Sequence, residues 1–567
     1  MAGTEAVYDL DNLLINLKTY GNYQIRQLLV VSSSLLIVSH SIFQLLAIGY
    51  TPDHQCKDLS VEQLSIYNVT SYDDISYEKC HINIFRGLKN ITDELSCING
   101  HNYSANKDIS FVIEWNLVCD KEGLAELTQS LFTAGQGAGA LIFTAFADKI
   151  GRKPVHVGCT FFLVLCASGS ALSPNIWVFA ALRVLSGAFQ QGSAIPGYTM
   201  ILEMFSADKR TLISCILGVW WSICVMILAL VAYVMRHSEW RWLCAVLGLP
   251  GIVCVFEFWY LRESIRWLFA KGKIVEAERI VKRAAKLNGV DFEAAWTKCL
   301  KSNESAMEMH QLGEQSKELI DKNGTNPEDE AEVHPKETAL GLLTMMKYST
   351  TRNITLVVMF AWLITSVTYF GLYLTSSSLS GDRHLNYFLI ASMELPSSFV
   401  QYKLLMLFGR KKAIIILIAA SAVTLLAVAV LKSVGDSDAI NTATVVLSLL
   451  GMVGISGAFG GLWLYTPEIY PTTLRTAGMG VASATARIGS MISPYTRMLA
   501  ARVVWGPGLV FGAGCFIASS LLLTLPETHN KQLPQNLDEM LSFKRERGKG
   551  EDGKKRKNIN SKNKEEI

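Results

Sequence analysis

Two ionisable side chains lie inside segments that are otherwise apolar and long enough to cross a membrane. Arg487 is near the middle of the run from 476 to 500, and Glu394 is inside the run from 385 to 408. A charge at membrane depth costs about 2.5 to 3.5 kcal/mol on insertion scales, so such a group usually faces a polar cavity. At about 1.5 Å per residue both fall near the midplane. We expect them to line one cavity, and a buried structural ion pair is the alternative.

Aromatic side chains recur at helical spacing on the run from 354 to 375. Trp362, Tyr369 and Tyr373 follow one another at seven and four residues, which places them on one face of a helix. Such a face can hold a quaternary ammonium by cation–π attraction of about 0.5 to 2 kcal/mol per ring, and packing in a core or against lipid is the alternative. Further candidates for the same cavity on other runs are Gln190, Tyr198 and Tyr465.

Charged residues of both signs gather where the apolar runs end. They can pair when that side of the protein closes and separate when it opens, which would make them a gate. The alternative is a set of static topology signals and helix caps, since exposed pairs contribute only about 0 to 1 kcal/mol. The gate candidates are Asp148, Arg152, Glu203, Arg210, Glu263, Arg266, Glu468 and Arg475.

The composition indicates the class of protein that positions these residues. Of the 567 residues 50% are hydrophobic and 18% are charged, and the mean hydropathy is +0.27. A water-soluble protein of this length would expose too much hydrocarbon, so we expect a multi-span membrane protein. The net charge of +3 is too small to suggest a nucleic-acid partner. The first twenty residues contain no apolar core, so the first span must also serve in targeting.

Apolar runs of about 20 residues, the length that spans a bilayer, predict an all-α membrane protein. They number twelve and are approximately 27–50, 124–146, 155–174, 176–202, 212–235, 241–261, 354–375, 385–408, 413–432, 441–466, 476–500 and 506–526. A polar segment divides them six and six. The predicted organisation is an N-terminal segment 1–26, a six-helix half 27–261, a linker 262–353 with amphipathic helices, a second half 354–526, and a tail 527–567.

Basic residues predict the orientation of these helices. Lys149, Lys209, Lys411 and Arg475 follow the second, fourth, eighth and tenth runs. The positive-inside rule places these turns in the cytosol. Both termini are then cytosolic, and the segment from 51 to 123 lies outside.

The segment 51–123 combines two signs of an oxidised outer domain. It holds four cysteines and three acceptor sites for N-glycosylation, which predict two disulfides of unspecified connectivity and attached glycans. Chance is the alternative, because further acceptor sites occur at Asn303, Asn323 and Asn353. The residues concerned are Cys56, Cys80, Cys97, Cys119, Asn68, Asn90 and Asn102.

Three signatures repeat in the two halves, in the same order and at nearly the same offset. The first is IGRKP at 150–154 with FGRKK at 408–412. The second is Glu203 and Arg210, seven residues apart, with Glu468 and Arg475 at the same spacing. The third is Glu263 with Glu527. Such a repeat indicates a duplication. Two similar six-helix halves can rock about a central site, as alternating access requires. Arg487 has no charged counterpart in the first half, which favours a role in substrate binding.

Several of these motifs resemble one known family. They are DKIGRK at 148–153, ESIRWL at 263–268, EIYPTTLR at 468–475 and LPET at 525–528. The first is similar to a loop motif of the major facilitator superfamily, and together with the long first loop they resemble the organic cation, anion and zwitterion transporters (solute carrier family 22). The chain departs from the family pattern at Thr144, Arg262, Ile265 and Met406. The resemblance implies the major facilitator fold and a plasma-membrane transporter.

The resemblance also bears on the substrate. At the position of Arg487 the strictly cationic members carry aspartate, and the anion and carnitine-type members carry arginine. The sequence ELP at Glu394 resembles the cation and carnitine branches instead. A zwitterion such as carnitine or a betaine satisfies both, and organic cations and then organic anions are the alternatives.

Other functions are weighed against transport. A receptor or scaffold without transport is an alternative of another class, and no enzymatic motif is found. We expect no cofactor and no metal; the coupling ion, sodium or proton, and any protein partner are left open.

Overall fold

A computed structural model describes most of the chain. The residues described are 10–67, 75–85, 91–206, 209–297, 345–347, 349–376, 379, 381–435, 437–470 and 474–528. The predicted acceptor sites Asn68 and Asn90, most of the linker after 297 and nearly all of the tail lie outside them.

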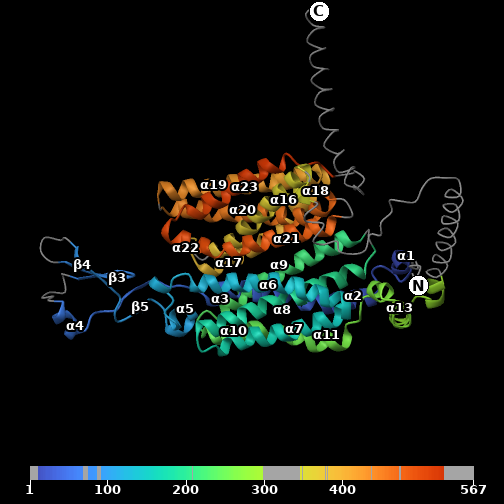
Figure 1. Ribbon diagram of the computed structural model, residues 1–567, viewed down its shortest axis with the longest axis horizontal. Helices are drawn as coiled ribbons and strands as arrows, with labels where there is room; N and C mark the ends of the chain where they lie inside the picture. Colours follow the sequence, from blue (N-terminus) through green and yellow to red (C-terminus); the bar gives the residue numbers. More distant parts are fainter. Residues whose placement is uncertain are drawn as a thin grey trace, which may run out of the picture.

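The helices form two bundles that lie side by side along the long axis of the molecule (Figure 1). The N-terminal bundle contains α2 (Asn22–Ser33), α3 (Leu35–Ile48), α6 (Leu124–Ile150), α7 (Arg152–Gly169), α8 (Ile176–Glu203), α9 (Arg210–Val234), α10 (Trp240–Gly248) and α11 (Val253–Tyr260). The C-terminal bundle contains α16 (Ser349–Thr375), α17 (Arg383–Ser392), α18 (Glu394–Phe408), α19 (Arg410–Val434), α20 (Asp438–Ile469), α21 (Arg475–Ile492), α22 (Tyr495–Arg502) and α23 (Gly506–Leu522). Short 3₁₀ turns cover Ser170–Leu172 and Leu249–Ile252.

Every predicted apolar run lies on these helices. Among the described residues eight segments are both long and apolar enough to cross a membrane, and α23 is apolar but shorter. The three remaining runs are α8, the pair α17 and α18, and the pair α21 and α22. They carry Arg183, Glu394 and Arg487, respectively. Each of these runs thus contains a charged side chain, and two of them are divided into shorter helices. Helix α16 begins at Ser349, earlier than the predicted residue 354, because polar residues extend its first turn.

Proline residues interrupt two of the helices that carry these charges. Pro396 has no N–H to bond the carbonyl of Ser392, where α17 ends, and α18 begins at Glu394. Pro494 likewise separates α21 from α22. Glu394 therefore lies at a break in its helix.

The segment between α3 and α6 projects from one end of the bundles, which we call the loop end (Figure 1). It contains β1 (His54–Cys56), α4 (Val61–Ile66), β2 (Ile75–Tyr77), β3 (His81–Phe85), β4 (Ile91–Ser96), β5 (His101–Tyr103), α5 (Phe111–Glu114) and 3₁₀ turns at Lys107–Ile109 and Cys119–Lys121. The strands make two antiparallel sheets, ordered β1-β5 and β2-β3-β4. Asn102 lies on β5 with an exposed side chain.

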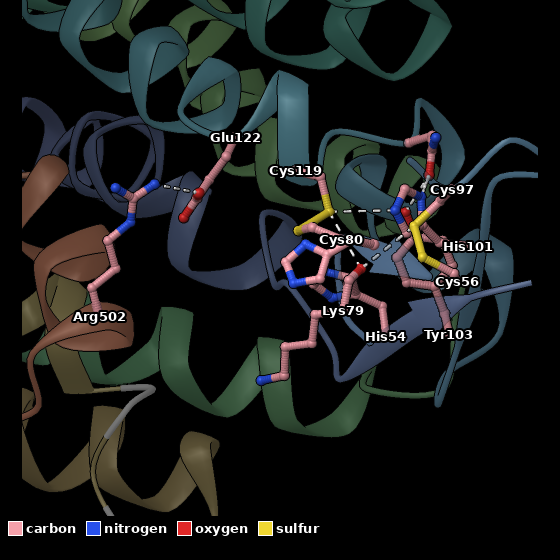
Figure 2. Close-up of a disulfide and its surroundings, with 12 residues drawn as sticks. His54, Cys56, Lys79, Cys80, Cys97, His101, Tyr103, Cys119, Glu122 and Arg502 are labelled. Carbon is pink, nitrogen blue, oxygen red and sulfur yellow. Dashed lines mark hydrogen bonds and ion pairs between the residues drawn. A yellow bond between two sulfur atoms is a disulfide. The ribbon is translucent and has the colours of Figure 1, made fainter. Parts of the chain in front are cut away.

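Two disulfides tie this segment together. The pairs are Cys56–Cys97 and Cys80–Cys119, with Cα–Cα distances of 5.0 and 5.4 Å. Figure 2 shows His54 and His101 beside the second disulfide. In the part of the chain that the structure describes, the one cluster with metal-ligand spacing is His54, Cys80 and Cys119, and both of its sulfur atoms are in the disulfide.

Short helices cover the opposite end, which we call the linker end. They are α1 (Leu10–Asn16), α12 (Ile265–Ala270) and α13 (Ile274–Asn288). The apolar side of α13 packs with Leu13, Trp267 and Leu268 in a separate small core. The amphipathic pattern predicted for the linker forms this core.

The linker end shows the duplication in three dimensions. Glu263 accepts hydrogen bonds from the backbone N–H groups of Arg152 (3.1 Å) and Lys153 at the start of α7. Glu527 does the same for Arg410 (2.9 Å) and the next residue at the start of α19. Each carboxylate thus caps the N-terminus of a helix in its own bundle, where the helix dipole favours negative charge.

A glycine with a positive φ precedes each capped helix. The φ angles are 118° at Gly151 and 84° at Gly409. A Cβ atom at Gly151 would lie 2.4 Å from a carboxylate oxygen of Glu263. Glycine is therefore required there both for its conformation and for the approach of the carboxylate.

Candidate functional site

Glu394 lies in a cage of hydroxyl groups between the two bundles. Its Oε1 accepts hydrogen bonds from the Tyr373 hydroxyl, at 2.7 Å, and from the Tyr369 hydroxyl. Its Oε2 accepts one from Ser222 Oγ on α9, at 3.3 Å. The residue is only 4% exposed. A buried carboxylate on α18 therefore has donors from two other helices, α16 and α9, one in each bundle.

Arg487 makes a different set of contacts. Its Nη1 donates to Gln136 Oε1 on α6 at 3.0 Å, and Gln136 Nε2 donates to Gln190 Oε1 on α8 at 2.9 Å. No ion pair joins Arg487 to Glu394, although both are described. The alternative of a buried structural pair is therefore not what the structure shows. The guanidinium has one neutral acceptor among the described residues, and its remaining donors are available to a ligand.

A cavity lies beside Arg487 where the bundles meet. Its walls include Phe43, Gln136, Phe370, Ser490 and Ser493. Ser490 follows Arg487 by one helical turn, and Gln136 binds the guanidinium, but neither Arg487 nor Glu394 itself lines the cavity, contrary to the expectation that both would. Apolar side chains and a few polar groups of both bundles line it, and its volume of about 10 Å³ is that of a single water molecule, so the described state leaves little free space there.

The predicted aromatic face divides into two parts. Tyr369 and Tyr373 join Glu394, and Phe43 of the N-terminal bundle packs on Tyr373 with ring centroids 4.5 Å apart. Trp362 is fully buried, donates to Thr466 Oγ1 at 2.9 Å and lies outside the hydroxyl cage. The periodicity placed the three residues on one face but did not fix their neighbours.

Two other predicted residues lie apart from this cluster. The Tyr465 hydroxyl donates to the carbonyl of Pro526 at the linker end. Tyr198 is 46% exposed and donates to Ser214 Oγ. Gln190 alone among the further candidates connects to Arg487, through Gln136.

The charged residues predicted as a gate form one network in each bundle. In the N-terminal bundle Arg152 pairs with Glu203 at 3.1 Å and with Asp148 at 3.9 Å. Arg266 Nε donates to the Glu203 carbonyl at 3.2 Å, and Ser264 donates to its carboxylate. Burial raises the pKa of the Glu263 carboxyl, against backbone N–H donors that lower it.

The C-terminal network is built similarly. Glu468 pairs with Arg410 at 3.6 Å and accepts a hydrogen bond from Thr528 at 2.6 Å. The side chain of Arg475 lies outside the described residues. Arg210 Nε donates to the carbonyl of Phe205 at 3.4 Å, so this arginine closes a local turn. The ion pairs described at the linker end each stay within one bundle.

Contacts between the bundles concentrate toward the loop end, which the sequence did not reveal. Arg497 on α22 binds Glu126 on α6 at 2.6 and 3.0 Å and donates to the carbonyl of Gly49 at 2.8 Å. Arg502 pairs with Glu122 at 3.0 Å, as Figure 2 shows. These contacts hold the loop end closed.

A second buried arginine was missed by the sequence reasoning. Arg183 on α8 is 2% exposed and donates to the Ser41 carbonyl at 2.8 Å, to Gln44 Oε1 at 3.1 Å and to Gln129. Its guanidinium lies 4.2 Å from the ring centroid of Phe132. The signal that identified Arg487, a charge inside an apolar run, was present at 183 as well.

Comparisons with known proteins agree with this architecture. Residues 121–494 match the model of the Major Facilitator Superfamily. The chain is 32% identical to the organic cation/carnitine transporter 2 of Mus musculus over 462 residues, 80% of this chain and 75% of the relative. It is 29% identical to the organic cation transporter-like protein of Drosophila melanogaster over 93% of this chain and 91% of the relative. It is 27% identical to the organic anion transporter 3 of Oryctolagus cuniculus over 89% of this chain and 88% of the relative.

A solved structure shares the fold. The xylose transporter XylE from E. coli, in a partially occluded inward open conformation, superposes with a TM-score of 0.59 at 14% identity, covering 90% of this chain and 100% of that chain. The fold and the family match define a major facilitator transport protein. Within that superfamily the chain belongs to the organic cation, anion and zwitterion transporters, solute carrier family 22. It is a multi-pass membrane transporter of organic solutes and not an enzyme.

Proposed function

We propose that this protein carries small zwitterions of the carnitine or betaine type across the plasma membrane by alternating access. The observation that carries the proposal is the state of Arg487. Its guanidinium lies where the bundles meet and has one neutral amide oxygen as partner among the described residues. A planar guanidinium binds a carboxylate through two parallel hydrogen bonds, so its free donors suit the carboxylate of a zwitterion.

The hydroxyl cage supports the other half of the proposal. The rings of Tyr369 and Tyr373 flank a carboxylate, a setting that attracts a quaternary ammonium by cation–π and charge attraction. The relatives named organic cation/carnitine transporter 2 are consistent with this substrate class.

The gates support alternating access. We propose that the loop end, with its disulfides, faces the outside and the linker end and both termini face the cytosol. The contacts of Arg497 and Arg502 then close the outer side, and the networks around Glu203 and Glu468 form cytosolic gate elements that would join when the inner side closes. The coupling ion on this proposal is sodium or a proton.

One observation favours a second candidate, an organic anion. Glu394 already has three hydroxyl donors, whereas Arg487 has no charged partner among the described residues. If these hydroxyl groups keep Glu394 from binding an ammonium group, Arg487 is the charge that binds substrate, and the site prefers a substrate with a carboxylate alone.

Uptake of three radiolabelled compounds tests these candidates. Cells that express the protein are given carnitine, tetraethylammonium and p-aminohippurate, with and without sodium and at two pH values. We expect carnitine uptake, and we expect Arg487→Asp to reduce it by about 10- to 100-fold, since a hydrogen bond to a charged group contributes about 1.5 to 3 kcal/mol. Arg487→Lys keeps the positive charge but loses the paired donors of the guanidinium, so its carnitine uptake should lie between that of the wild type and that of Arg487→Asp.

The other outcomes are equally clear. Uptake of tetraethylammonium alone, unchanged in Arg487→Asp, would falsify the zwitterion proposal. Uptake of p-aminohippurate alone would support the anion candidate. Absence of accumulation in sealed vesicles for all three would indicate a receptor or scaffold. Surface labelling of each variant controls for loss of protein from the membrane.

A further inference from the structure

A histidine and a carboxylate are buried together inside the N-terminal bundle. His156 on α7 and Glu257 on α11 are 1% and 0% exposed, and His156 Nε2 lies 3.4 Å from Glu257 Oε2. His156 is one helical turn from Arg152, where α7 begins, and Glu257 is one turn from the end of α11 at Tyr260. The pair is therefore enclosed but close to the linker end.

The hydrogen bonds of the imidazole fix where its protons are. Nδ1 is 2.7 Å from the carbonyl oxygen of Ser193 on α8. A carbonyl only accepts, so Nδ1 carries a proton. Nε2 then faces the carboxylate, and one more proton must lie between them as N–H···O or as O–H···N. Neither carboxylate oxygen of Glu257 has a hydrogen-bond partner in the described part of the chain, and neither does His156 Nε2, so the two groups meet at ion-pair distance.

Among the described residues, His156 is the one ion-pair partner of Glu257. Between Arg183 and Glu203, α8 has no ionisable side chain except Tyr198, which is half exposed. Other titratable or charged groups lie on the elements that pack around the pair. They include the thiols of Cys159, Cys166 and Cys254, Lys153 over the Phe258 ring, Arg152 paired with Glu203, Glu263 at the cap of α7, Tyr23 and exposed Arg26 on α2, Asp148 and Lys149 on α6, and Arg241 on α10. Loss of the shared proton would leave a buried carboxylate opposite a lone pair, which is strongly unfavourable.

The pair connects to the substrate site through α8. Ser193 follows Gln190 by about one turn, and Gln190 is joined through Gln136 to Arg487. The Ser193 hydroxyl also bonds Thr160 Oγ1 on α7 at 2.7 Å. Helix α8 therefore carries both Ser193, whose carbonyl binds the imidazole, and Gln190, which is connected through Gln136 to Arg487.

The packing of α8 on the imidazole is tight. A Cβ atom at Gly197 would lie 2.8 Å from His156 Nδ1 and Cε1. Pro196, one residue earlier, lacks the N–H that would bond the Gly192 carbonyl, so α8 has a weakened turn at this contact. A shift of α8 during transport would change the distance between the imidazole and its acceptor.

We propose that His156 and Glu257 form a proton-binding site that is coupled through α8 to substrate movement. One proton from the solution at the linker end binds between Nε2 and Oε2 and leaves to the same solution; no other bond forms or breaks. The coupling rests on the proposed function, because it requires that the protein moves a substrate. The proton site itself does not depend on the proposed function.

Transport in proteoliposomes tests the coupling. The purified full chain is reconstituted, and initial uptake of carnitine is measured from pH 5.5 to 8.5 for the wild type, His156→Gln, Glu257→Gln and the double variant. The double variant keeps two neutral groups that can bond each other and so guards against misfolding. Thr160→Val, which removes a neighbouring hydroxyl but no titratable group, is the matched control.

We expect uptake by the wild type and Thr160→Val to change at least threefold across this range, and all three pair variants to give a flat profile. A wild-type profile retained in His156→Gln and Glu257→Gln would overturn the coupling, as would uptake by the wild type that does not vary with pH. The two glutamine variants are compared at equal amounts of reconstituted protein.

A second measurement does not depend on transport. Thermal unfolding of the detergent-purified protein is followed over the same pH range. An unfolded histidine releases its proton above about pH 6.5 while the folded pair keeps one, so the unfolding midpoint of the wild type should fall, relative to Glu257→Gln, as the pH rises above that value. Parallel curves would overturn the proton site. Diverging curves with no uptake of any of the three compounds would refute the proposed function and the coupling and leave the proton site standing.

Discussion

Replacement of Arg497 by alanine should open the loop end of this transporter. The guanidinium joins α22 of the C-terminal bundle to Glu126 on α6 and to the carbonyl that ends α3. The Arg497 and Glu126 side chains are 15% and 7% exposed. The contact is therefore largely shielded from water, unlike the exposed pair of Arg502 and Glu122, at 71% and 36%.

The size of the effect follows from what the substitution leaves behind. Removing one partner of a buried ion pair costs about 3 to 5 kcal/mol, because the remaining charge is buried without compensation. In a state with the loop end open, Glu126 meets water and this cost disappears. Taking about 3 kcal/mol as the difference, the ratio of open to closed forms should rise about 100-fold, since 1.36 kcal/mol is a factor of ten.

Cysteine accessibility measures this ratio. Ser490 lines the cavity between the bundles and is buried in the described state. In a Ser490→Cys background, a membrane-impermeant thiol reagent added from outside should label Arg497→Ala far faster than the parent, up to the rate for a fully accessible thiol. The protein without Ser490→Cys gives the background from its native free cysteines.

Two variants decide the interpretation. Arg502→Ala should change the labelling rate less than about fivefold, because exposed pairs contribute only about 0 to 1 kcal/mol. The exchange Glu126→Arg with Arg497→Glu should restore slow labelling. Equal rates in Arg497→Ala and its parent, or an effect of Arg502→Ala as large as that of Arg497→Ala, would refute the reasoning.

Three further predictions concern stability. Tyr373→Phe removes a donor to buried Glu394 and should lower the free energy of unfolding by about 1.5 to 3 kcal/mol in detergent; Tyr387→Phe is its control, because the Tyr387 hydroxyl is buried without a partner among the described residues and its loss should cost little. Burial raises the pKa of Glu263, so the stability that its protonated form contributes is fully present below the ordinary carboxyl pKa and is lost as the pH rises through the raised pKa. Measured from pH 4 to 7, the unfolding midpoint of Glu263→Gln should therefore rise relative to that of the wild type as the pH increases. Cys80→Ser with Cys119→Ser should cost about 2 to 5 kcal/mol of folding free energy and reduce the amount of protein at the cell surface, and a yield equal to that of the wild type would contradict this.

The sequence was sufficient where the determining forces are local or cumulative. Apolar runs located every helix of both bundles, because a bilayer rejects polar segments of that length. The repeated motifs at 150–154 and 408–412 predicted matching turns, and Glu263 and Glu527 cap both of them. Counting residues along a helix of fixed rise also predicts that Arg487 and Glu394 lie at a similar depth.

The sequence could not say which way these side chains face or what they meet. The partner of Arg487 is Gln136, which is 351 positions away in the chain. The donors to Glu394 come from two other helices, one in each bundle. The same criterion that selected Arg487 applied to Arg183, yet Arg183 donates to three neutral acceptors and Arg487 to one. Only the packing of the bundles distinguishes a satisfied arginine from one with free donors.

The sequence by itself thus determined the class of protein, its spans and the charges that must lie inside the membrane. Tertiary structure alone decided the disulfide pairing, the hydroxyl cage, the closed loop end and the buried contact of His156 with Glu257. The physical reason is that insertion into a bilayer depends on the summed hydropathy of one segment, whereas a hydrogen bond or an ion pair depends on the relative rotation of two helices, which the sequence of neither helix records.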